Sequence, residues 1–166
     1  MSCISIAVEM ERVWQPTLKR NYSHQKLIPK KFHLQISKFS SSAVDKIVIY
    51  RSQSANFSEL NKEIETITDR KKPQLIIGDF NFCYLTSTSN ATRKYLLSKH
   101  FFKLIQEPTH IEGNLLDQAY LRDIGGILDC TAEVHSKYYT DYKGIAIVIN
   151  TVEKNNFKVL IINLFF

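Results

Sequence analysis

A short apolar run between a proline and a glycine constrains the fold of this chain more than any other feature. Residues 74–78, Gln-Leu-Ile-Ile-Gly, directly follow Pro73. An apolar run of this length without alternation is typical of a strand buried on both faces, because both sets of side chains then avoid water. The run therefore predicts an inner strand of a layered domain.

Strand and helix patterns are interleaved along the chain, and no internal repeat is found. The strongest helix pattern follows Asn56, which can cap its N-terminus, with Glu59 in the position that completes a capping box. The apolar stripe of this helix consists of Phe57, Leu60, Ile64 and Ile67. A second helix is expected at residues 92–99, a long loop at 14–31, and strands at 4–8, 32–39, 47–50, 115–121, 131–135 and 144–149. This order predicts a layered α/β or α+β domain.

The composition is that of one globular domain with a local excess of positive charge. The 166 residues are 44% hydrophobic and 23% charged, and a chain near this size hides roughly two-thirds of its unfolded surface on folding. The net charge of +6 is concentrated in residues 1–43, which carry seven Lys or Arg against two Glu. Such a patch can contact phosphate, and a solvated lysine-rich loop is an equally good interpretation.

The cysteines and the termini bear on the cellular compartment. Cys3, Cys83 and Cys130 form no CxxC pair, and their odd number argues against a disulfide scaffold. An intracellular location, nuclear or cytoplasmic, is therefore expected. Glu9 and nearby charges interrupt the first apolar stretch before a signal peptide develops, and the apolar tail at residues 159–166 is too short to cross a bilayer. No membrane partner is expected.

The sequence Gly78-Asp79-Phe80-Asn81 is the most informative position for chemistry. It ends the expected inner strand, and an acid and an amide two residues apart in an extended chain point to the same side. Open α/β sheets bind ligands at strand ends, where a carboxylate can orient water or hold a hard cation and an amide can donate to a phosphoryl oxygen. A plain turn explains the tetrapeptide equally well.

Two further acidic residues lie within or beside expected strands. Asp117 is in the middle of an apolar strand pattern, and we expect it to face solvent or a polar partner, because a buried unpaired carboxylate is costly. Asp141 precedes the strand expected at residues 144–149, where a turn cap is an equally good interpretation. Neither acid indicates a function alone, but the order of all these motifs does.

The ordered motifs resemble the endonuclease/exonuclease/phosphatase superfamily. The matching segments are Ile49-Tyr50, residues 76–81 (Ile-Ile-Gly-Asp-Phe-Asn), Pro108-Thr109-His110, residues 116–120 (Leu-Asp-Gln-Ala-Tyr) and residues 138–142 (Tyr-Tyr-Thr-Asp-Tyr). The resemblance covers about residues 44–150 and looks closest to the endonuclease-like domains of retrotransposons and other mobile elements. It implies an α+β fold, a two-layer β-sandwich flanked by helices, and hydrolysis of phosphodiester or phosphomonoester bonds with Mg²⁺ or Mn²⁺.

The resemblance also implies roles for single residues. Tyr50 corresponds to a tyrosine that contacts the scissile phosphate, and Thr109 lies near a position used for substrate contact. Asp79 corresponds to the acid that orients the attacking water. Asn81 corresponds to the amide that supports the transition state.

The remaining site positions include the main departure from the family pattern. Asp117 corresponds to the acid that supports the catalytic histidine, and Asp141 to the acid of the closing Ser-Asp-His motif near the metal, which makes Asp141 the expected metal ligand. Tyr142 occupies the place of the histidine, and its pKa near 10 prevents proton uptake near neutral pH, although its hydroxyl can still donate to a phosphoryl oxygen. The metal-binding Glu that the family carries upstream has no clear counterpart.

The sequence leaves two functions open. The first is a truncated, weakly active or inactive endonuclease of mobile-element origin that acts on DNA or RNA; the second is a non-catalytic remnant that binds nucleic acid weakly. We expect residues 1–150 to form a partial domain that lacks its N-terminal strands. Residues 151–166 are expected to be an apolar tail that either adds a strand or stays disordered. The sequence does not indicate an oligomeric state.

Overall fold

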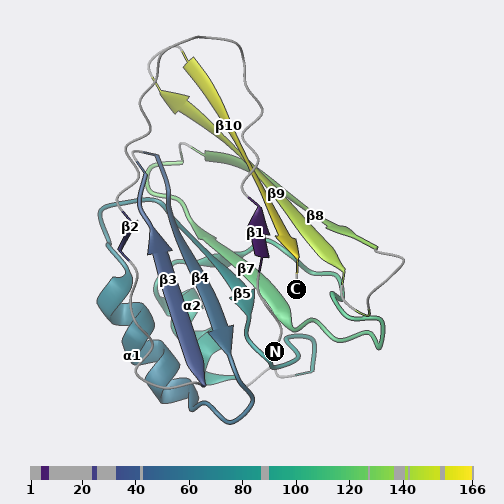
Figure 1. Cartoon of the computed structure of the whole chain (residues 1–166). Coiled ribbons are helices and arrows are strands. Elements are labelled where there is room, and N and C mark those ends of the chain that lie inside the picture. Colours follow the sequence, from purple (N-terminus) through teal and green to yellow (C-terminus); the bar gives the residue numbers. More distant parts are fainter. Residues whose placement is uncertain are drawn as a thin grey trace.

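The protein has an α+β fold with two sheets and two helices in its described part (Figure 1). The computed structural model describes residues 5–7, 24–25, 33–41, 43–86, 90–126, 128–136, 141, 143–153 and 156–165. For the strands nearest the two termini, the backbone alone is described. The sheets face each other and the helices lie on the outer side of one sheet, which is the helix-flanked sandwich that the resemblance implies.

The larger sheet has six strands in the order β2-β3-β4-β5-β7-β6. Their bounds are His24–Gln25 for β2, Leu34–Phe39 for β3, Asp45–Arg51 for β4, Gln74–Asp79 for β5, Asp117–Arg122 for β7 and Phe102–Lys103 for β6. β4 and β5 are parallel, and the other neighbouring strands are antiparallel. All six residues of β5 are buried, which confirms the prediction of an inner strand from the apolar run.

The smaller sheet has four antiparallel strands in the order β1-β10-β9-β8. Their bounds are Ser5–Ala7 for β1, Asn156–Phe165 for β10, Gly144–Glu153 for β9 and Leu128–His135 for β8. The apolar tail thus forms β10, which pairs along β9 and meets the N-terminal strand β1 (Figure 1). Residues from both ends of the chain are therefore neighbours in one sheet.

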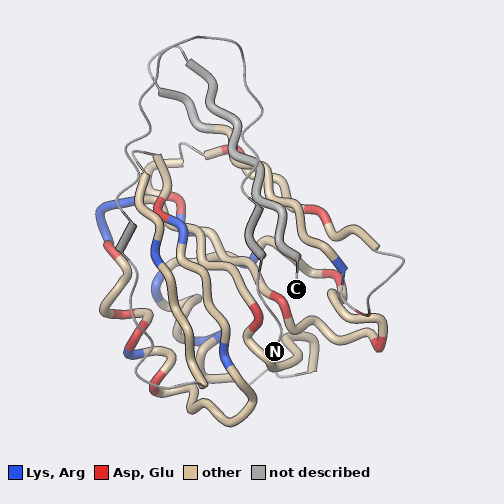
Figure 2. The backbone as a smooth tube through the Cα atoms, viewed as in Figure 1, with Lys and Arg blue, Asp and Glu red and all other residues tan. Residues whose placement is uncertain are grey.

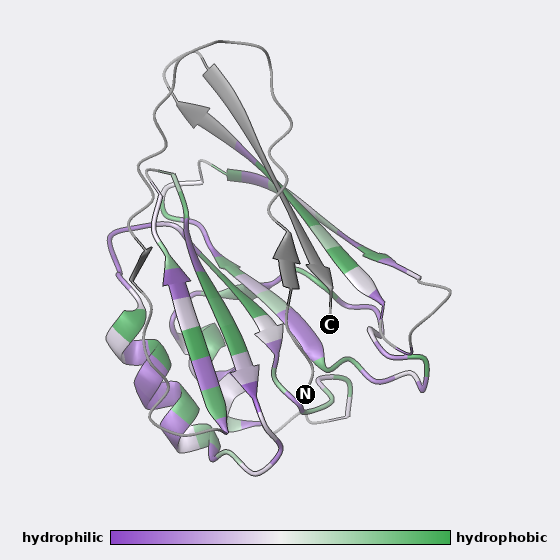
Figure 3. Cartoon of the chain, in the orientation of Figure 1, coloured by the Kyte–Doolittle hydropathy of each residue, from purple (hydrophilic) through white to green (hydrophobic). Residues whose placement is uncertain are grey.

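Two apolar cores hold these layers together. The core between the sheets includes Val48, Leu75, Ile77, Ala119, Leu121, Ile145, Ile147 and Ile149. The core between the larger sheet and the helices includes Ile47, Ile49, Leu60, Ile64, Ile76, Leu96, Phe101 and Tyr120. Because adjacent residues of a strand point to opposite faces, the inner strands contribute to both cores and are hydrophobic along most of their length (Figure 3).

Both predicted helices are present, and α2 is displaced by one residue from the range expected for it. α1 spans Phe57–Ile67, and its N-cap Asn56 accepts the backbone N–H of Ser58 at 2.8 Å through Oδ1. α2 spans Ala91–Ser98. Each helix buries one side against the larger sheet, and the apolar stripe predicted for α1 supplies Leu60, Ile64 and Ile67 on that side.

Some elements differ from the sequence predictions. β6 was not expected, because a two-residue strand carries no periodic pattern. β8 and β9 are longer than expected. Their ends are partly polar, so the apolar pattern did not predict them as strand, but the backbone pairing continues through them. The loop expected at residues 14–31 lies outside the described residues apart from β2. In the part of the chain that the structure describes, no helix has the length and apolar character needed to cross a membrane.

Candidate functional site

Three neighbouring strands place Tyr50, Asp79 and Asp117 in one row. Tyr50 of β4 is the register partner of Asp79 of β5, and Asp79 is the register partner of Asp117 of β7. Alternation along each strand directs all three side chains toward the smaller sheet, the same side as the apolar residues of the inter-sheet core. Adjacent strands lie about 4.8 Å apart, so the row brings these polar groups together at one end of the sandwich.

Gly78 allows β4 and β5 to approach each other closely next to this row. A Cβ atom at position 78 would lie 1.7 Å from the carbonyl oxygen of Ile49, its register partner, and the φ of Gly78 is +150°. A side chain therefore cannot be accommodated without movement of β4 or β5. The glycine of the Gly-Asp-Phe-Asn sequence thus has a packing role, which the turn interpretation did not include.

Asn81 fixes the Asp79 carboxylate at both of its oxygens. The backbone N–H of Asn81 donates to Oδ1 at 2.8 Å, and the side-chain amide donates to Oδ2 at 3.0 Å. Asn81 has a φ of +50°, a left-handed conformation that asparagine tolerates better than most residues. The sequence predicted the acid and the amide on one side, and the structure brings them into direct contact with each other.

Asp79 lies in a mixed electrostatic environment. Burial raises the pKa of its carboxyl group, while the hydrogen bond from Asn81 and the positive charge of Arg51 oppose this rise. Arg51 is itself buried, lies 4.0 Å from the centroid of the Phe57 ring, and donates to the carbonyl oxygen of Ser52 at 2.9 Å. Sequence reasoning missed Arg51, and its only signal was a charged residue at the end of an apolar strand, next to Tyr50.

Asp117 is fully buried, which excludes the predicted alternative that it faces solvent and leaves the one in which it faces polar groups. Its relative exposure is 0%, and neither carboxylate oxygen has a hydrogen-bond partner among the described residues. Burial, with a contribution from the negative charge of Asp79, raises the pKa of Asp117 to about 7; the nearby Thr109 hydroxyl opposes this rise. Strand pairing, which sequence alternation does not reveal, turns Asp117 toward another acid.

Thr109 connects the beginning of β7 to the segment that carries Asp141. Its buried hydroxyl oxygen accepts the backbone N–H groups of Leu116 at 3.3 Å and Asp117 at 3.2 Å. Its carbonyl oxygen accepts the N–H of Lys143 at 2.8 Å. The structure therefore places Thr109 beside Asp117, where its buried hydroxyl supports the beginning of β7.

Asp141 is brought close to this loop through its backbone. Its carbonyl oxygen accepts the N–H of Ile111 at 3.0 Å, and the residue is exposed. Tyr142, the residue at the histidine position, lies outside the described residues. Asp141 thus lies near the end of the sandwich that carries Asp79 and Asp117, and the roles of Asp141 and Tyr142 stay predictions.

The carboxyl groups of this row supply only part of the ligand set that a hard cation needs. Across the described ranges, no group of three or more His, Cys, Asp or Glu side chains is close enough to hold a metal ion. Two neighbouring carboxyl groups are present, however, and Asp117 has two oxygens without a hydrogen-bond partner among the described residues. Mg²⁺ commonly binds one or two carboxylates and completes its shell with water and substrate phosphate, so Asp79 and Asp117 fit this mode of binding.

Comparisons with known proteins concern the fold. No protein-family model and no curated protein matches the sequence significantly. The chain is similar to an endonuclease/exonuclease/phosphatase family protein from Leptotrichia buccalis, with 12% identity and a TM-score of 0.45 over 99% of this chain and 72% of that one. It is also similar to beta toxin from Staphylococcus aureus, with 9% identity and a TM-score of 0.37, over 80% of this chain and 56% of the toxin.

A mutant of beta toxin with bound magnesium ions gives a TM-score of 0.37 at 11% identity, over 80% of this chain and 57% of that one. The chain therefore spans a little over half the length of the toxin structures that it resembles.

Proposed function

We propose that this chain is a metal-dependent phosphodiesterase of the endonuclease/exonuclease/phosphatase type that acts slowly on nucleic acid. The observation that supports this proposal is the row of Tyr50, Asp79 and Asp117 on one face of three adjacent strands. These residues are far apart in the sequence, and they match the family motifs in the order expected. Mobile-element origin is a part of the proposal that rests on the sequence motifs alone.

Asp79 is the proposed general base. A base must be held within hydrogen-bonding reach of the water whose proton it accepts, and the two hydrogen bonds from Asn81 hold the carboxylate in one orientation. Burial raises the pKa of Asp79, which makes its carboxylate a stronger base than an exposed one. Tyr50, one strand away, is placed to donate its phenolic hydrogen to a phosphoryl oxygen.

Asp117 is the proposed second acid of the site. Burial, together with the negative charge of Asp79, raises the pKa of its carboxyl group to about 7, so the protonated and ionised forms are both populated near neutral pH. Once ionised, Asp117 could hold Mg²⁺ or Mn²⁺ together with Asp141, a ligand proposed from the motif, and the metal would neutralise phosphate charge and lower the pKa of a bound water. Thr109 keeps the backbone of Asp117 in place through the two hydrogen bonds to its hydroxyl oxygen.

A non-catalytic nucleic-acid-binding domain is the second candidate. It is favoured by the burial of Asp117, which raises the pKa of its carboxyl group to about 7, and by a tyrosine in place of the family histidine at position 142. Removing one member of a catalytic set can lower the rate by several orders of magnitude. The basic residues within positions 1–43 would then supply the phosphate contacts.

Nicking of supercoiled plasmid with Mg²⁺ or Mn²⁺ tests the proposal. We expect slow nicking by the natural chain, a rate at least 100-fold lower in Asp79→Asn, and an unchanged rate in Asp129→Asn, an exposed acid on β8. Equal nicking by Asp79→Asn would overturn the assignment of the base. A chain that shifts DNA in a gel but shows no nicking with either metal would establish the non-catalytic candidate instead.

A further inference from the structure

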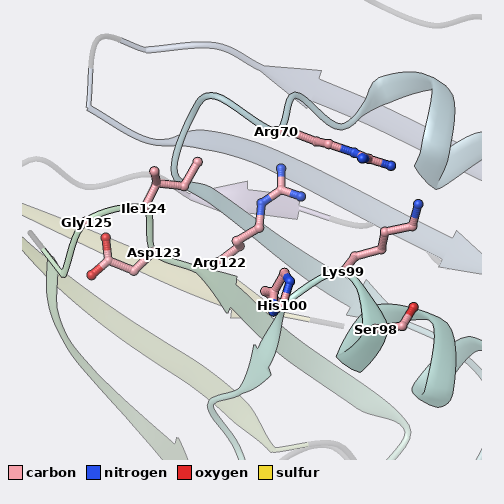
Figure 4. Close-up of a pocket in the computed structure, with 8 residues that line it drawn as sticks. All are labelled: Arg70, Ser98, Lys99, His100, Arg122, Asp123, Ile124 and Gly125. Carbon is pink, nitrogen blue, oxygen red and sulfur yellow. The ribbon is translucent and has the colours of Figure 1, made fainter.

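A basic pocket lies at the end of the larger sheet opposite to the Asp79–Asp117 row. It has a volume of about 580 Å³ and is lined by Arg70, Ser98, Lys99, His100, Arg122, Asp123, Ile124 and Gly125 (Figure 4). Gln74, at this end of β5, is five residues from Asp79, which corresponds to roughly 17 Å of extended strand. Gln74 and Arg122 also face the helices, whereas Asp79 faces the smaller sheet, so the two places are separate.

The cations of this pocket come from three different elements. Arg70 belongs to the basic segment that follows α1 (Figure 2), Lys99 follows α2, and Arg122 ends β7. Their head groups gather on one side of the pocket in Figure 4, whereas the Asp123 carboxylate lies at the other side. Oδ2 of Asp123 accepts the backbone N–H of Leu128 at 3.2 Å, whereas its Oδ1 is buried and has no hydrogen-bond partner among the described residues.

Arg122 is the cation of this group that the surrounding residues hold in place. It is only 6% exposed, its Nη2 atom donates to the carbonyl oxygen of Asp69 and to the side chain of Gln74, and its guanidinium lies 4.6 Å from the Phe101 ring centroid. Its Nε atom is buried and has no hydrogen-bond partner among the described residues. A buried arginine with an unused donor is costly unless an acceptor is supplied, which points to an anionic ligand.

Glu65 leaves the other two cations incompletely neutralised. One carboxylate is shared by Lys99, whose Nζ atom lies 2.6 Å away, and by Arg70, whose Nη2 atom lies 3.4 Å away. The carboxylate also accepts the hydroxyl of Tyr95 and is not part of the pocket lining. Since one carboxylate is shared by two cations, the charge of Glu65 alone does not neutralise both Arg70 and Lys99.

The C-terminal end of α2 opposes a bound anion less strongly than free carbonyl groups would. α2 ends beside the pocket, and the carbonyl oxygens of its last turn accept hydrogen bonds. Leu97 accepts the N–H of His100, and Leu96 accepts the N–H of Phe101, each at 3.0 Å. The negative end of this helix is thus partly satisfied by its own chain.

We propose that this pocket binds the phosphate group of a small anionic ligand. Two arginines and a lysine that converge from separate elements are the donors that phosphate groups commonly recruit in proteins. The geometry is independent of the proposed phosphodiesterase site, because neither Asp79 nor Asp117 lines the pocket. The ligand class is a phosphate or phosphomonoester, whose compact charge three head groups can surround.

Calorimetric titration with inorganic phosphate, at constant ionic strength set with chloride, tests the proposal. We expect saturable binding that is at least tenfold weaker in the Arg70→Gln, Lys99→Gln double variant. The Lys62→Gln, Lys94→Gln double variant removes the same charge from exposed positions on α1 and α2, and its affinity should change less than twofold. No saturable binding, or equal weakening in both variants, would overturn the proposal.

A further variant separates this pocket from the proposed catalytic site. Asp79→Asn should leave phosphate binding unchanged, whether or not the chain hydrolyses nucleic acid. If Asp79→Asn alters binding while the Arg70→Gln, Lys99→Gln variant does not, phosphate binds at the other end of the sheet and the assignment to this pocket is wrong. Titration with glycerol 3-phosphate and with a nucleoside monophosphate then shows, by a gain in affinity over inorganic phosphate, which kind of molecule carries the phosphate.

Discussion

Asp79 and Asp117 lie directly opposite each other on antiparallel strands, and both point into the space between the two sheets. Asn81 supplies two hydrogen bonds to Asp79, whereas the oxygens of Asp117 accept none from the described residues. Two carboxylates in this position repel each other when both are ionised. A shared proton or a bound cation relieves that repulsion, so this pair links the stability of the fold to the chemistry of the site.

The pair makes stability depend on pH. The pKa of Asp117 is about 7 in the folded chain, against an ordinary value of 3.8, so the folded state binds the extra proton between these pH values. The contribution of Asp117 is therefore complete below about pH 4 and is lost as the pH rises through 7. Asp117→Asn stays neutral and should avoid this loss.

We expect Asp117→Asn to have a higher free energy of unfolding than the natural chain at pH 8, by up to about 4 kcal/mol, and a similar one at pH 4. Urea denaturation in metal-free buffer with a chelator measures this difference. Asp129→Asn, at an exposed position, should track the natural chain at both pH values. A lower stability of Asp117→Asn at pH 8 would show that the carboxylate is stabilised by a partner.

Thr109→Val removes the acceptor for two backbone N–H groups at the beginning of β7. Leaving buried donors without an acceptor costs about 2 kcal/mol of unfolding free energy, and the branched apolar side chain keeps the packing similar. Thr109→Ser retains the hydroxyl and should cost less than about 1 kcal/mol. Urea denaturation of both variants gives the comparison, and equal losses would mean that the methyl group, rather than the hydroxyl, matters.

Gly78→Ala places a methyl group against the backbone of β4. Its Cβ atom would lie 1.7 Å from the carbonyl oxygen of Ile49, so we expect a loss of about 3 kcal/mol or more. Gly113→Ala is the matched control, because Gly113 has a φ of +82° but open space around its Cβ position. It should cost only about 1 kcal/mol, from backbone conformation. Similar losses in the two variants would contradict the close approach of β4 and β5.

His100→Gly should stabilise the chain. His100 has a φ of +62° and follows α2 in the position where a helix usually ends with glycine, with its N–H donating to the carbonyl oxygen of Leu97. Glycine carries no Cβ penalty there, so we expect a gain of about 1 kcal/mol in thermal or urea unfolding. His100→Ala also removes the imidazole but keeps Cβ, and it should give no gain. A gain in both variants would assign the effect to the imidazole.

Local patterns predicted the elements that depend on local physics. The inner strand β5 was predicted because its apolar run needs burial on both faces, and α1 because its cap and apolar stripe fall at helical spacing. β6 was missed because its two residues carry no pattern. Arg51 was missed because a buried cation is recognisable only once the surroundings of the strand end are known.

The sequence by itself determined the inner strand, the helix that precedes it and the acid and amide that follow it, because each depends on residues a few positions apart. Tertiary structure alone decided that Asp117 is buried and that its neighbour is Asp79. That relationship depends on which strands pair and in which register, and the pairing is selected by the packing of two apolar cores on opposite faces of the sheet.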